Sequence, residues 1–234
     1  MKKSFLFLSL LLLAMAGISQ SDAKALEVVQ KSIDACGGKD KMAAITSMSR
    51  KMEINMPFGT SESESYHKNG KYYTKSTMNG NVNFEQKYDG NRAYVGGMQG
   101  NQILDDEKSV KRVAQQGKIS PIMDLLGSDI NLKYAGTEKI DGKMCDKITS
   151  KGEDGNEATM FFNTDSKYLM RTITKGEMQG NAFEMTIDFD DYKPIEGILF
   201  AHTMKMNTGQ FQMEMKVKEI KLNPDIPDSM FLIQ

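Results

Sequence analysis

Turn dipeptides recur at a fixed step in the first half of the chain. They are Asn69-Gly70, Asn79-Gly80 and Asp89-Gly90, and Gln99-Gly100 follows one step later. Asn-Gly and Asp-Gly suit type I′ turns, because both central residues of such a turn need a positive φ. The segments between the turns have the length of ordinary strands. The spacing therefore predicts an antiparallel meander.

Alternation of apolar and polar residues predicts further strands and their buried faces. The clearest apolar sets are Met48, Met52, Ile54 and Met56; Phe183, Met185, Ile187 and Phe189; and Phe211, Met213, Met215 and Val217. Later turns are predicted at Asp141-Gly142, Asp154-Gly155, 163–166, Gln179-Gly180 and 207–209. About eleven or twelve strands are too many for a flat sheet, so a barrel or half-barrel is favoured. We predict a mostly β chain with a few helices (α+β), whose single, strongly curved antiparallel sheet forms a half-barrel.

Helical patterns occur at the N-terminus and in the middle of the chain. Residues 22–36 carry apolar side chains at helical spacing, begin at a capping sequence and end at Gly37-Gly38. A second short helix is predicted over about 40–45. Residues 105–116 and 120–127 predict a helical pair that interrupts the strands. These helices are the available covers for an apolar sheet face.

The first 21 residues have the features of a signal peptide. Two lysines precede a short apolar run at 5–16, and small or polar residues follow. The run is too short to span a membrane as a helix, and no cysteine near its end offers a site for a lipid anchor. We expect cleavage somewhere between residues 16 and 23, which leaves a single mature domain at 22–234. The protein is then exported to the periplasm or secreted, and it carries no lipid anchor and no transmembrane span.

Composition excludes some partners and leaves other questions open. Thirty basic and 31 acidic residues give a net charge of -1, which argues against nucleic acid as a partner. The two cysteines, Cys36 and Cys145, are compatible with one disulfide or with two buried thiols. Nineteen methionines and no tryptophan indicate an adaptable apolar cavity, or simply methionine used where other proteins use leucine.

Residues that carry chemistry are few. His202 is interpreted as a hydrogen-bonded structural residue and His67 as a solvated residue before a turn. Asp188, Asp190 and Asp191 are compatible with a calcium site, but a solvated strand end is favoured. Glu62 and Glu64 share a strand face and are interpreted as outward-facing. No catalytic or metal-binding motif is found, so we expect no enzyme activity, no cofactor and no metal.

Arg50 is the one charged residue that shares a face with the apolar side chains of the first strand. It either reaches water from a rim or bonds backbone carbonyls over an apolar space, and the first interpretation is favoured. Strand parity also selects candidate residues for an apolar ligand pocket. They are Met52, Ile54, Phe183, Met185, Ile187, Phe200, Met204, Met213 and Met215.

Three segments of the chain resemble the outer-membrane lipoprotein-sorting (LolA-like) superfamily. They are residues 25–41, with the helix and its Gly-Gly end, residues 190–200, with Lys-Pro-Ile-Glu-Gly-Ile, and residues 218–231, with Asn-Pro-Asp-Ile-Pro. The resemblance implies a half-barrel closed by helices that carries a lipid or a lipidated protein. It also implies that an arginine on an early strand contacts the closing lid, a role for which Arg50 is the candidate.

Three hypotheses for the function follow. The first is a non-enzymatic periplasmic carrier that holds a lipid or a lipoprotein acyl chain between sheet and helices. The second is a secreted module with a fully packed core, whose partner is another envelope protein. The third, an enzyme, has only weak constellations of residues behind it.

Overall fold

The computed structural model describes residues 21–97, 100–127, 130–152, 155–178 and 181–233. The predicted signal peptide, apart from its last residue, lies outside these ranges. So do the turn Gln179-Gly180, Gln99 and Asp154.

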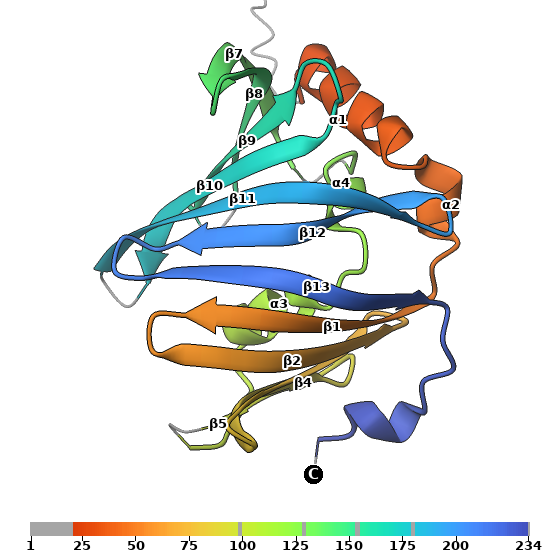
Figure 1. Ribbon diagram of the computed structural model, residues 1–234, viewed down its shortest axis with the longest axis vertical. Helices are drawn as coiled ribbons and strands as arrows, with labels where there is room; N and C mark the ends of the chain where they lie inside the picture. Colours follow the sequence, from red (N-terminus) through yellow and green to blue (C-terminus); the bar gives the residue numbers. More distant parts are fainter. Residues whose placement is uncertain (1–20, 98–99, 128–129, 153–154, 179–180, 234) are drawn as a thin grey trace, which may run out of the picture.

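Within the described residues, thirteen strands form one antiparallel sheet (Figure 1). The first meander contains β1 (Ser47–Met56), β2 (Gly59–Lys68), β3 (Lys71–Met78), β4 (Asn81–Tyr88), β5 (Ala93–Gly97) and β6 (Gln102–Leu104). The second contains β7 (Leu132–Ile140), β8 (Lys143–Lys151), β9 (Glu157–Asn163), β10 (Leu169–Met178), β11 (Asn181–Ile195), β12 (Ile198–Asn207) and β13 (Gln212–Leu222). The prediction of a mostly β chain with one antiparallel sheet is confirmed.

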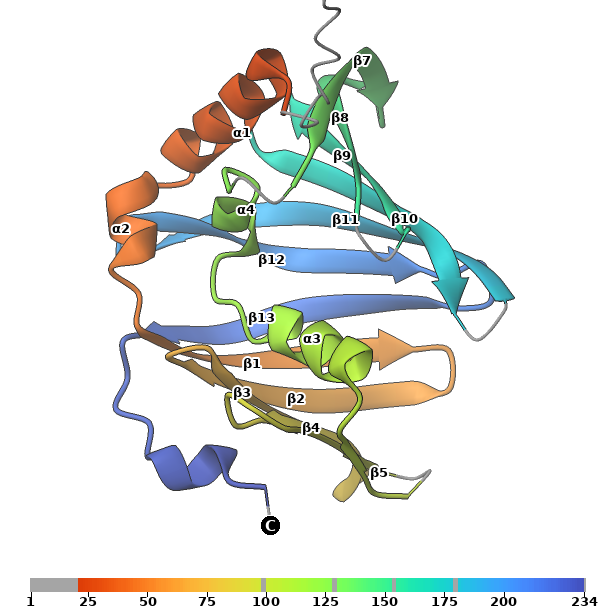
Figure 2. The same cartoon turned by 180° about the vertical axis from the view of Figure 1, so that it is seen from behind.

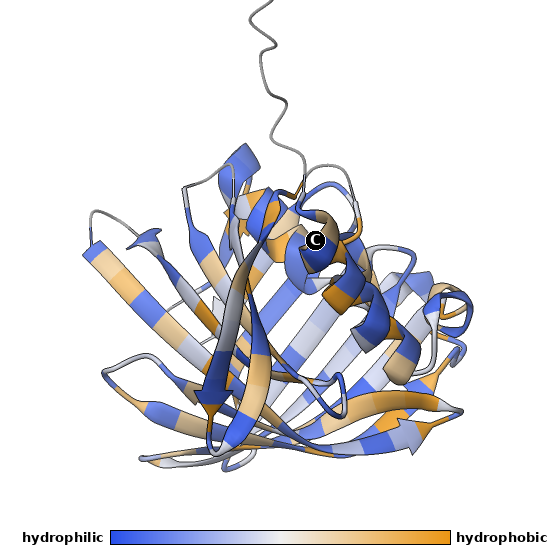
Figure 3. Ribbon diagram, turned by 90° about the horizontal axis from the view of Figure 1, so that it is seen from above, coloured by the Kyte–Doolittle hydropathy of each residue, from blue (hydrophilic) through white to orange (hydrophobic). Residues whose placement is uncertain are grey.

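The two meanders meet in the middle of the sheet. The strand order is β6-β5-β4-β3-β2-β1-β13-β12-β11-β10-β9-β8-β7, so β1 pairs with β13 and the edges are β6 and β7. Figure 3 shows the sheet curving around the helices. Because the two edge strands are not paired with each other, the curved sheet is a half-barrel and not a closed barrel, as predicted.

Three of the four predicted turn dipeptides that lie fully within the described residues have the expected backbone. Both central residues have positive φ in Asn69-Gly70, Asn79-Gly80 and Asp141-Gly142. Asp89 differs, because its carboxylate accepts hydrogen bonds from the backbone N–H groups of Asn91 and Arg92 and makes a wider loop.

The helices lie on one face of the sheet, which we call the inner face. They are α1 (Ala23–Ala35), α2 (Lys39–Ala43), α3 (Glu107–Gln116) and α4 (Pro121–Asp124). Figure 2 shows α3 and α4 in front of the strands, and α1 at the upper end beside β8 and β9. The C-terminal segment adds a short 3-10 helix, η1 (Asp228–Phe231). These positions confirm a cover made of an N-terminal helix and a mid-chain helical pair.

The main core lies between α1 and the β7–β9 end of the inner face. Its buried residues include Val29 and Ile33 of α1 together with Ile148 and Phe162 of the sheet. Helix α1 ends as its sequence predicts, since the N–H of Gly38 donates to the carbonyl oxygen of Ile33 at 2.9 Å. This contact closes the helix and turns the chain toward β1.

The two cysteines are free and buried. Cys36 belongs to the main core, whereas Cys145 belongs to a small cluster with Ile140 and Phe161. Phe161 neighbours Phe162 on β9 and points to the opposite face, because successive strand residues alternate. The cysteines therefore lie on opposite sides of the sheet, and the disulfide alternative is wrong. Among the described helices, none is long and apolar enough to cross a membrane.

Candidate functional site

Apolar side chains from four strands form continuous rows on the inner face. Ile54 is paired directly with Met215, Met215 with Met204, and Met204 with Phe189. A second row runs from Met213 through Met206 to Ile187. Side chains at directly paired positions of antiparallel strands point to the same face. The strand parity used in the sequence prediction therefore matches the register of the sheet.

The nine predicted pocket residues are all only partly buried. Met52 and Ile54 lie on β1; Phe183, Met185 and Ile187 on β11; Phe200 and Met204 on β12; and Met213 and Met215 on β13. Phe200 packs against the main core. By contrast, Leu132 and Ile148 are fully buried near α1 on the same face of β7 and β8. The helices thus fill one end of the inner face and leave the methionine-rich part partly uncovered.

A small cavity lies beside this methionine-rich part. It measures about 220 Å³ and is lined by Leu125 and Ile130 on the helical side and by Ala158 and Thr174 on the sheet side, among others. Thr174 is the direct partner of Met185, so the cavity adjoins the predicted residues. Its volume is below the range of about 300–1,000 Å³ that is typical of small-molecule sites.

A larger groove of about 510 Å³ lies near the β1–β2 and β12–β13 turns and is lined by residues of both faces, among them Met206 and Met213 of the inner rows. The groove lining includes one row of direct partners across β1, β13, β12 and β11. The row consists of Asn55, Glu214, Lys205 and Asp188. This row alternates with the methionine rows and therefore faces outward. Met213 is the one predicted pocket residue in the groove lining, and the charged row makes the groove a poor match for the predicted apolar cavity.

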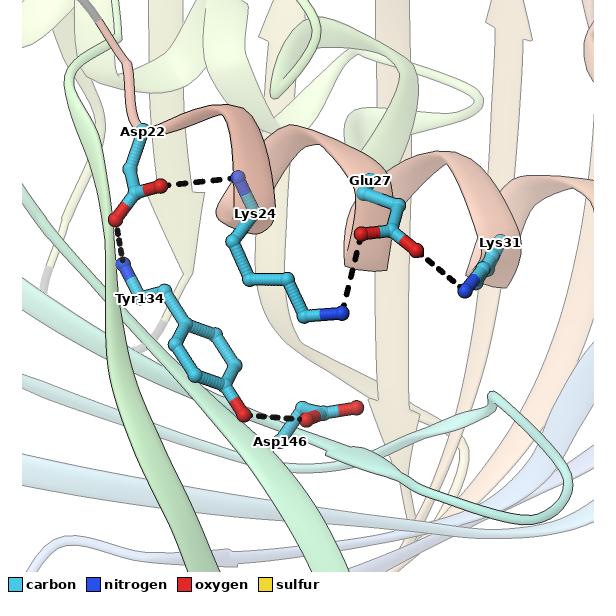
Figure 4. Close-up of polar contacts among 6 residues, drawn as sticks. All are labelled: Asp22, Lys24, Glu27, Lys31, Tyr134 and Asp146. Atoms are coloured by element: carbon cyan, nitrogen blue, oxygen red, sulfur yellow. Dashed lines mark hydrogen bonds and ion pairs between the residues drawn. The ribbon is translucent and has the colours of Figure 1, made fainter.

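Helix α1 is fixed firmly to the second meander (Figure 4). The Asp22 carboxylate accepts hydrogen bonds from the N–H groups of Lys24, at 2.9 Å, and of Tyr134 on β7, at 3.4 Å. The Tyr134 hydroxyl donates to Asp146 on β8 at 2.9 Å. Because the helix cap and two strands share one set of polar contacts, α1 forms a fixed part of the scaffold.

Charged residues on the exposed side of α1 form ion pairs within the helix. Glu27 lies between Lys24, at 3.1 Å, and Lys31, at 2.5 Å (Figure 4). Hydrogen bonds from Lys31 and Lys24 lower the pKa of Glu27 to about 2. The carboxylate is fully exposed, so these contacts add little to stability.

The mid-chain helices are held more weakly than α1. Helix α1 has five buried residues, whereas α3 buries only Val113 and α4 buries none. One polar contact joins the C-terminal end of α3 to the sheet, because Nδ1 of His67 on β2 lies 3.1 Å from the carbonyl oxygen of Gly117. His67 is buried, so the prediction of a solvated side chain is wrong. The residues that bury it follow α3, about fifty positions away in sequence.

The inner face of the first meander is polar, which the sequence analysis missed. Its buried side chains are Ser61, Ser63, Ser65, His67, Tyr72, Thr74, Ser76 and Gln86. Hydroxyl pairs such as Ser61 and Ser76, at 2.7 Å, satisfy part of this surface. The available signal was serine at every second position of β2, flanked by Glu62 and Glu64.

Arg50 lies on the inner face at the border between the polar and apolar halves. Its direct partner is Ser65, and Met52 follows it on the same face. The Nε atom of Arg50 is buried and has no hydrogen-bond partner among the described residues, and burial lowers the pKa of its guanidinium. The residue as a whole is partly exposed, as the favoured interpretation of an arginine at a rim expects, although its Nε is buried. The lid contact of Arg50 stays a prediction, because the contact between strand and helix segment is made by His67.

The remaining candidates have ordinary structural partners. Nδ1 of His202 bonds the carbonyl oxygen of Phe200 at 2.9 Å, which confirms the structural interpretation. Asp188 pairs with Arg171, and Asp191 pairs with Lys193. In the part of the chain that the structure describes, no group of three or more His, Cys, Asp or Glu side chains has an arrangement suited to a metal ion.

Comparisons with known proteins give structural matches only. No family model matches the chain, and no curated protein matches its sequence. A LolA superfamily protein from Nitrosomonas europaea matches with a TM-score of 0.60 and 14% identity, over 89% of this chain and 97% of the other. The fold is LolA-like.

Two further solved structures have the same architecture. A DUF1329 family protein from Desulfovibrio piger matches with a TM-score of 0.61 and 11% identity, over 89% of this chain and 97% of its own. A domain described as an outer-membrane lipoprotein-sorting protein, from Vibrio parahaemolyticus, matches with a TM-score of 0.57 and 12% identity, over 89% and 96%. The LolA-like fold predicted from the sequence is thus confirmed at the level of architecture.

Proposed function

We propose that this protein is a non-enzymatic carrier that holds an acyl chain, of a lipid or of a lipidated protein, between the curved sheet and its helical cover. The observation that carries the proposal is the pair of apolar rows through Met215 and Met213 on the inner face. These side chains lie on the covered side of the sheet but remain partly exposed. A core filled by its own helices would bury them.

An acyl chain fits this surface for physical reasons. Burial of each CH₂ group is worth about 0.8 kcal/mol, so a long chain binds without any directional contact. Methionine side chains have three rotatable bonds and adapt to different apolar shapes. The inner face contributes Met52, Met185, Met204 and Met215 to this adaptable surface.

Binding requires the cover to open. The cavity beside Leu125 and Thr174 is about 220 Å³ and must widen to admit a long chain. The segment with α3 and α4 is the part of the cover that can move, because it buries one side chain where α1 buries five. The fixed helix α1 then serves as the wall against which the ligand packs.

The proposal includes the compartment. The short apolar run at 5–16 with two lysines before it supports export, with a mature chain that begins between residues 17 and 24. The periplasm is the compartment proposed. A partner with which acyl chains are exchanged there is a lipidated protein or a membrane.

The experiment is native mass spectrometry of the mature protein purified from its own compartment, followed by denaturing extraction and lipid analysis. We expect a stoichiometric acyl species. The Met185→Gln/Met213→Gln double variant should lose that species, because two amides would lie in the apolar rows. Met204→Trp should also lose it, by filling the space with an apolar side chain.

Met144→Gln is the matched control. Met144 is an exposed methionine on β8, and its replacement should leave the bound species in place. Loss of the ligand in the control as well would mean that any methionine replacement disturbs the protein, and the proposed location would be withdrawn.

One observation favours the alternative of a protein partner. Phe58 is 72% exposed in the β1–β2 turn, and Phe211 is 42% exposed beside the neighbouring β12–β13 turn. Exposed aromatic side chains at adjacent hairpins are typical of interaction surfaces. A ligand-free mass that persists after incubation with lipid would favour this second function over the carrier.

A further inference from the structure

A row of polar side chains crosses the inner face on the side where α3 lies. Arg50 on β1, Ser65 on β2, Thr74 on β3 and Gln86 on β4 are direct partners from strand to strand. Such partners point to the same face with Cβ atoms about 5 Å apart. Ser65 and Gln86 are 2% and 6% exposed. The row is therefore continuous, with Ser65, Thr74 and Gln86 buried and Arg50 partly exposed.

Three of the four residues in the row have a buried atom without a partner. Among the described residues, Nε of Arg50, Oγ of Ser65 and Oε1 of Gln86 make no hydrogen bond. Thr74 differs, because its hydroxyl donates to the carbonyl oxygen of Glu64 at 3.1 Å. Buried polar atoms are nearly always hydrogen-bonded in native proteins. Three unpaired atoms in one row indicate a surface that is completed by something other than the chain itself.

His67 adds a fourth unpaired atom next to the row. It lies on the same face of β2 as Ser65, is 2% exposed, and its Nε2 atom has no partner among the described residues. Nδ1 lies 3.1 Å from the carbonyl oxygen of Gly117 and must donate to it, since a carbonyl oxygen only accepts. Burial lowers the pKa of His67 to about 4, so the ring is neutral and Nε2 is an acceptor. Nε of Arg50 and Oγ of Ser65 are therefore the two unpaired groups that can donate a hydrogen bond.

Arg50 is the only charged residue in the row, and this decides the chemistry of the group that fits. The ion pairs of the described residues do not include Arg50. A planar guanidinium matches the oxygens of a carboxylate or a phosphate, and the hydroxyl of Ser65 adds a second donor. The row is suited to an anionic oxygen group.

The apolar rows begin directly beside this position. Met52 follows Arg50 on the same face of β1, and both side chains are partly exposed. Residues two apart on a strand are separated by about 7 Å. A group held at Arg50 is therefore within reach of an apolar chain that lies on Met52, Ile54 and Met215.

We infer that Arg50 and Ser65 bind the anionic headgroup of the acyl ligand, so that the ligand class is an amphiphile with a carboxylate or phosphate at one end of its chain. This inference rests on the proposed carrier function. It also gives the ligand an orientation in the site, because the first meander holds the headgroup and β11–β13 hold the acyl chain.

The test compares three probes with the same twelve-carbon chain, namely laurate, dodecyl phosphate and dodecanol. Affinities for the full mature protein are measured by calorimetric titration below the critical micelle concentrations. We expect both anions to bind at least about tenfold more tightly than dodecanol, because only they satisfy the guanidinium. The relative affinity of laurate and dodecyl phosphate distinguishes a fatty-acid ligand from a phospholipid-type one.

Variants then assign the preference to the row. Arg50→Met should lower the affinity for both anions to that of dodecanol, and Ser65→Ala should lower it partly. Arg171→Met removes the same charge at the Asp188 pair of the outward-facing row and should keep the preference for anions. Arg50→Met should also be at least as stable as the wild-type chain, since it removes a partly buried guanidinium whose Nε has no partner among the described residues, whereas an arginine with a purely structural role would destabilise the chain on removal.

The possible outcomes separate the inference from the function on which it rests. Equal binding of all three probes by the wild-type chain would overturn the headgroup site and leave the carrier function standing. So would an anion preference that survives in Arg50→Met, and ordered water would then be the partner of the unpaired atoms. Absence of binding for all three probes would overturn both.

Discussion

Nδ1 of His67 lies 3.1 Å from the carbonyl oxygen of Gly117, and this contact joins the inner face of β2 to the C-terminal end of α3. The histidine is held between the ring of Tyr72, with centroids 4.9 Å apart, and the segment that follows the helix. Burial lowers its pKa to about 4, the hydrogen bond to the Gly117 carbonyl opposes this in part, and the charge of Arg50 adds a still smaller lowering. The stability of this contact between the sheet and the helical cover should therefore depend on pH.

Stability should fall as the pH is lowered through this range. His67 is neutral in the folded chain down to about pH 4, whereas the unfolded chain takes up the proton near 6.5. The stabilisation is complete above pH 6.5 and is lost as the pH falls toward 4, with a total of about 3 kcal/mol. Chemical denaturation at pH 7.0, 6.0 and 5.0 measures the slope. His67→Asn should flatten it, and an unchanged slope in that variant would assign the pH dependence to other groups.

Hydrogen exchange should distinguish the two parts of the cover. Amides of α3 should exchange faster than those of α1, because α3 buries only Val113 against five residues of α1. Asp106→Ala removes the carboxylate that accepts from the Ser109 N–H at 2.8 Å. The variant should speed amide exchange in α3 about fivefold, which corresponds to a loss of about 1 kcal/mol in the stability of the helix. Equal protection of both helices would contradict a movable cover.

The glycine pair after α1 offers a matched test of close packing. Gly37 and Gly38 both have positive φ, so alanine is strained at either position. A Cβ on Gly37 would meet the carbonyl oxygen of Gly197 at 2.7 Å, whereas a Cβ on Gly38 would meet nothing within 4 Å. Gly37→Ala should therefore destabilise the protein by about 1–3 kcal/mol more than Gly38→Ala. Thermal and denaturant unfolding of the two variants measure the difference. Equal losses of unfolding free energy would show that the clash with the Gly197 carbonyl does not contribute.

Phenylalanine truncations should separate the core from the rim. Phe162 is 1% exposed and packs beneath α1, whereas Phe58 is 72% exposed. Phe162→Ala should cost about 3–5 kcal/mol of unfolding free energy. Phe58→Ala should change it by less than about 0.5 kcal/mol. A large loss on truncation of Phe58 would mean that this side chain packs against a part of the protein in solution.

Thiol chemistry should confirm the cysteine assignment. Burial raises the pKa of the Cys36 thiol to about 11, and that of Cys145 is raised as well, again mainly by burial. Alkylation should be slow in the folded protein and should modify both thiols after unfolding without reductant. A requirement for reductant would show a disulfide and contradict the placement of the cysteines on opposite faces.

The fold was predictable wherever local sequence decides it. Asn69-Gly70 and Asn79-Gly80 adopt their turns because positive φ is required there, and Gly38 ends α1 for the same kind of reason. The Glu196-Gly197 hairpin escaped detection, although both residues have positive φ, because glutamate is an unusual residue for that position.

The apolar part of the candidate site followed from strand parity, but its polar part did not. Parity placed Met185 and Met215 on one face because the side-chain period of a strand is two. The burial of His67 involves the carbonyl of Gly117 at the end of α3, which is about fifty positions away in sequence. No local sequence pattern encodes such a contact. The polar row is defined by the register between strands, which the sequence alone does not give.

The pairing of β1 with β13 has a kinetic consequence. The two meanders are each built from neighbours in sequence, but their union waits until residues 212–222 can meet residues 47–56. Contacts of such long sequence separation form late and slowly. Until then the facing edges of β1 and β13 are unpaired and attract other chains. Refolding should therefore show a slow, aggregation-sensitive last phase, in which the separate half-sheets are the aggregation-prone species.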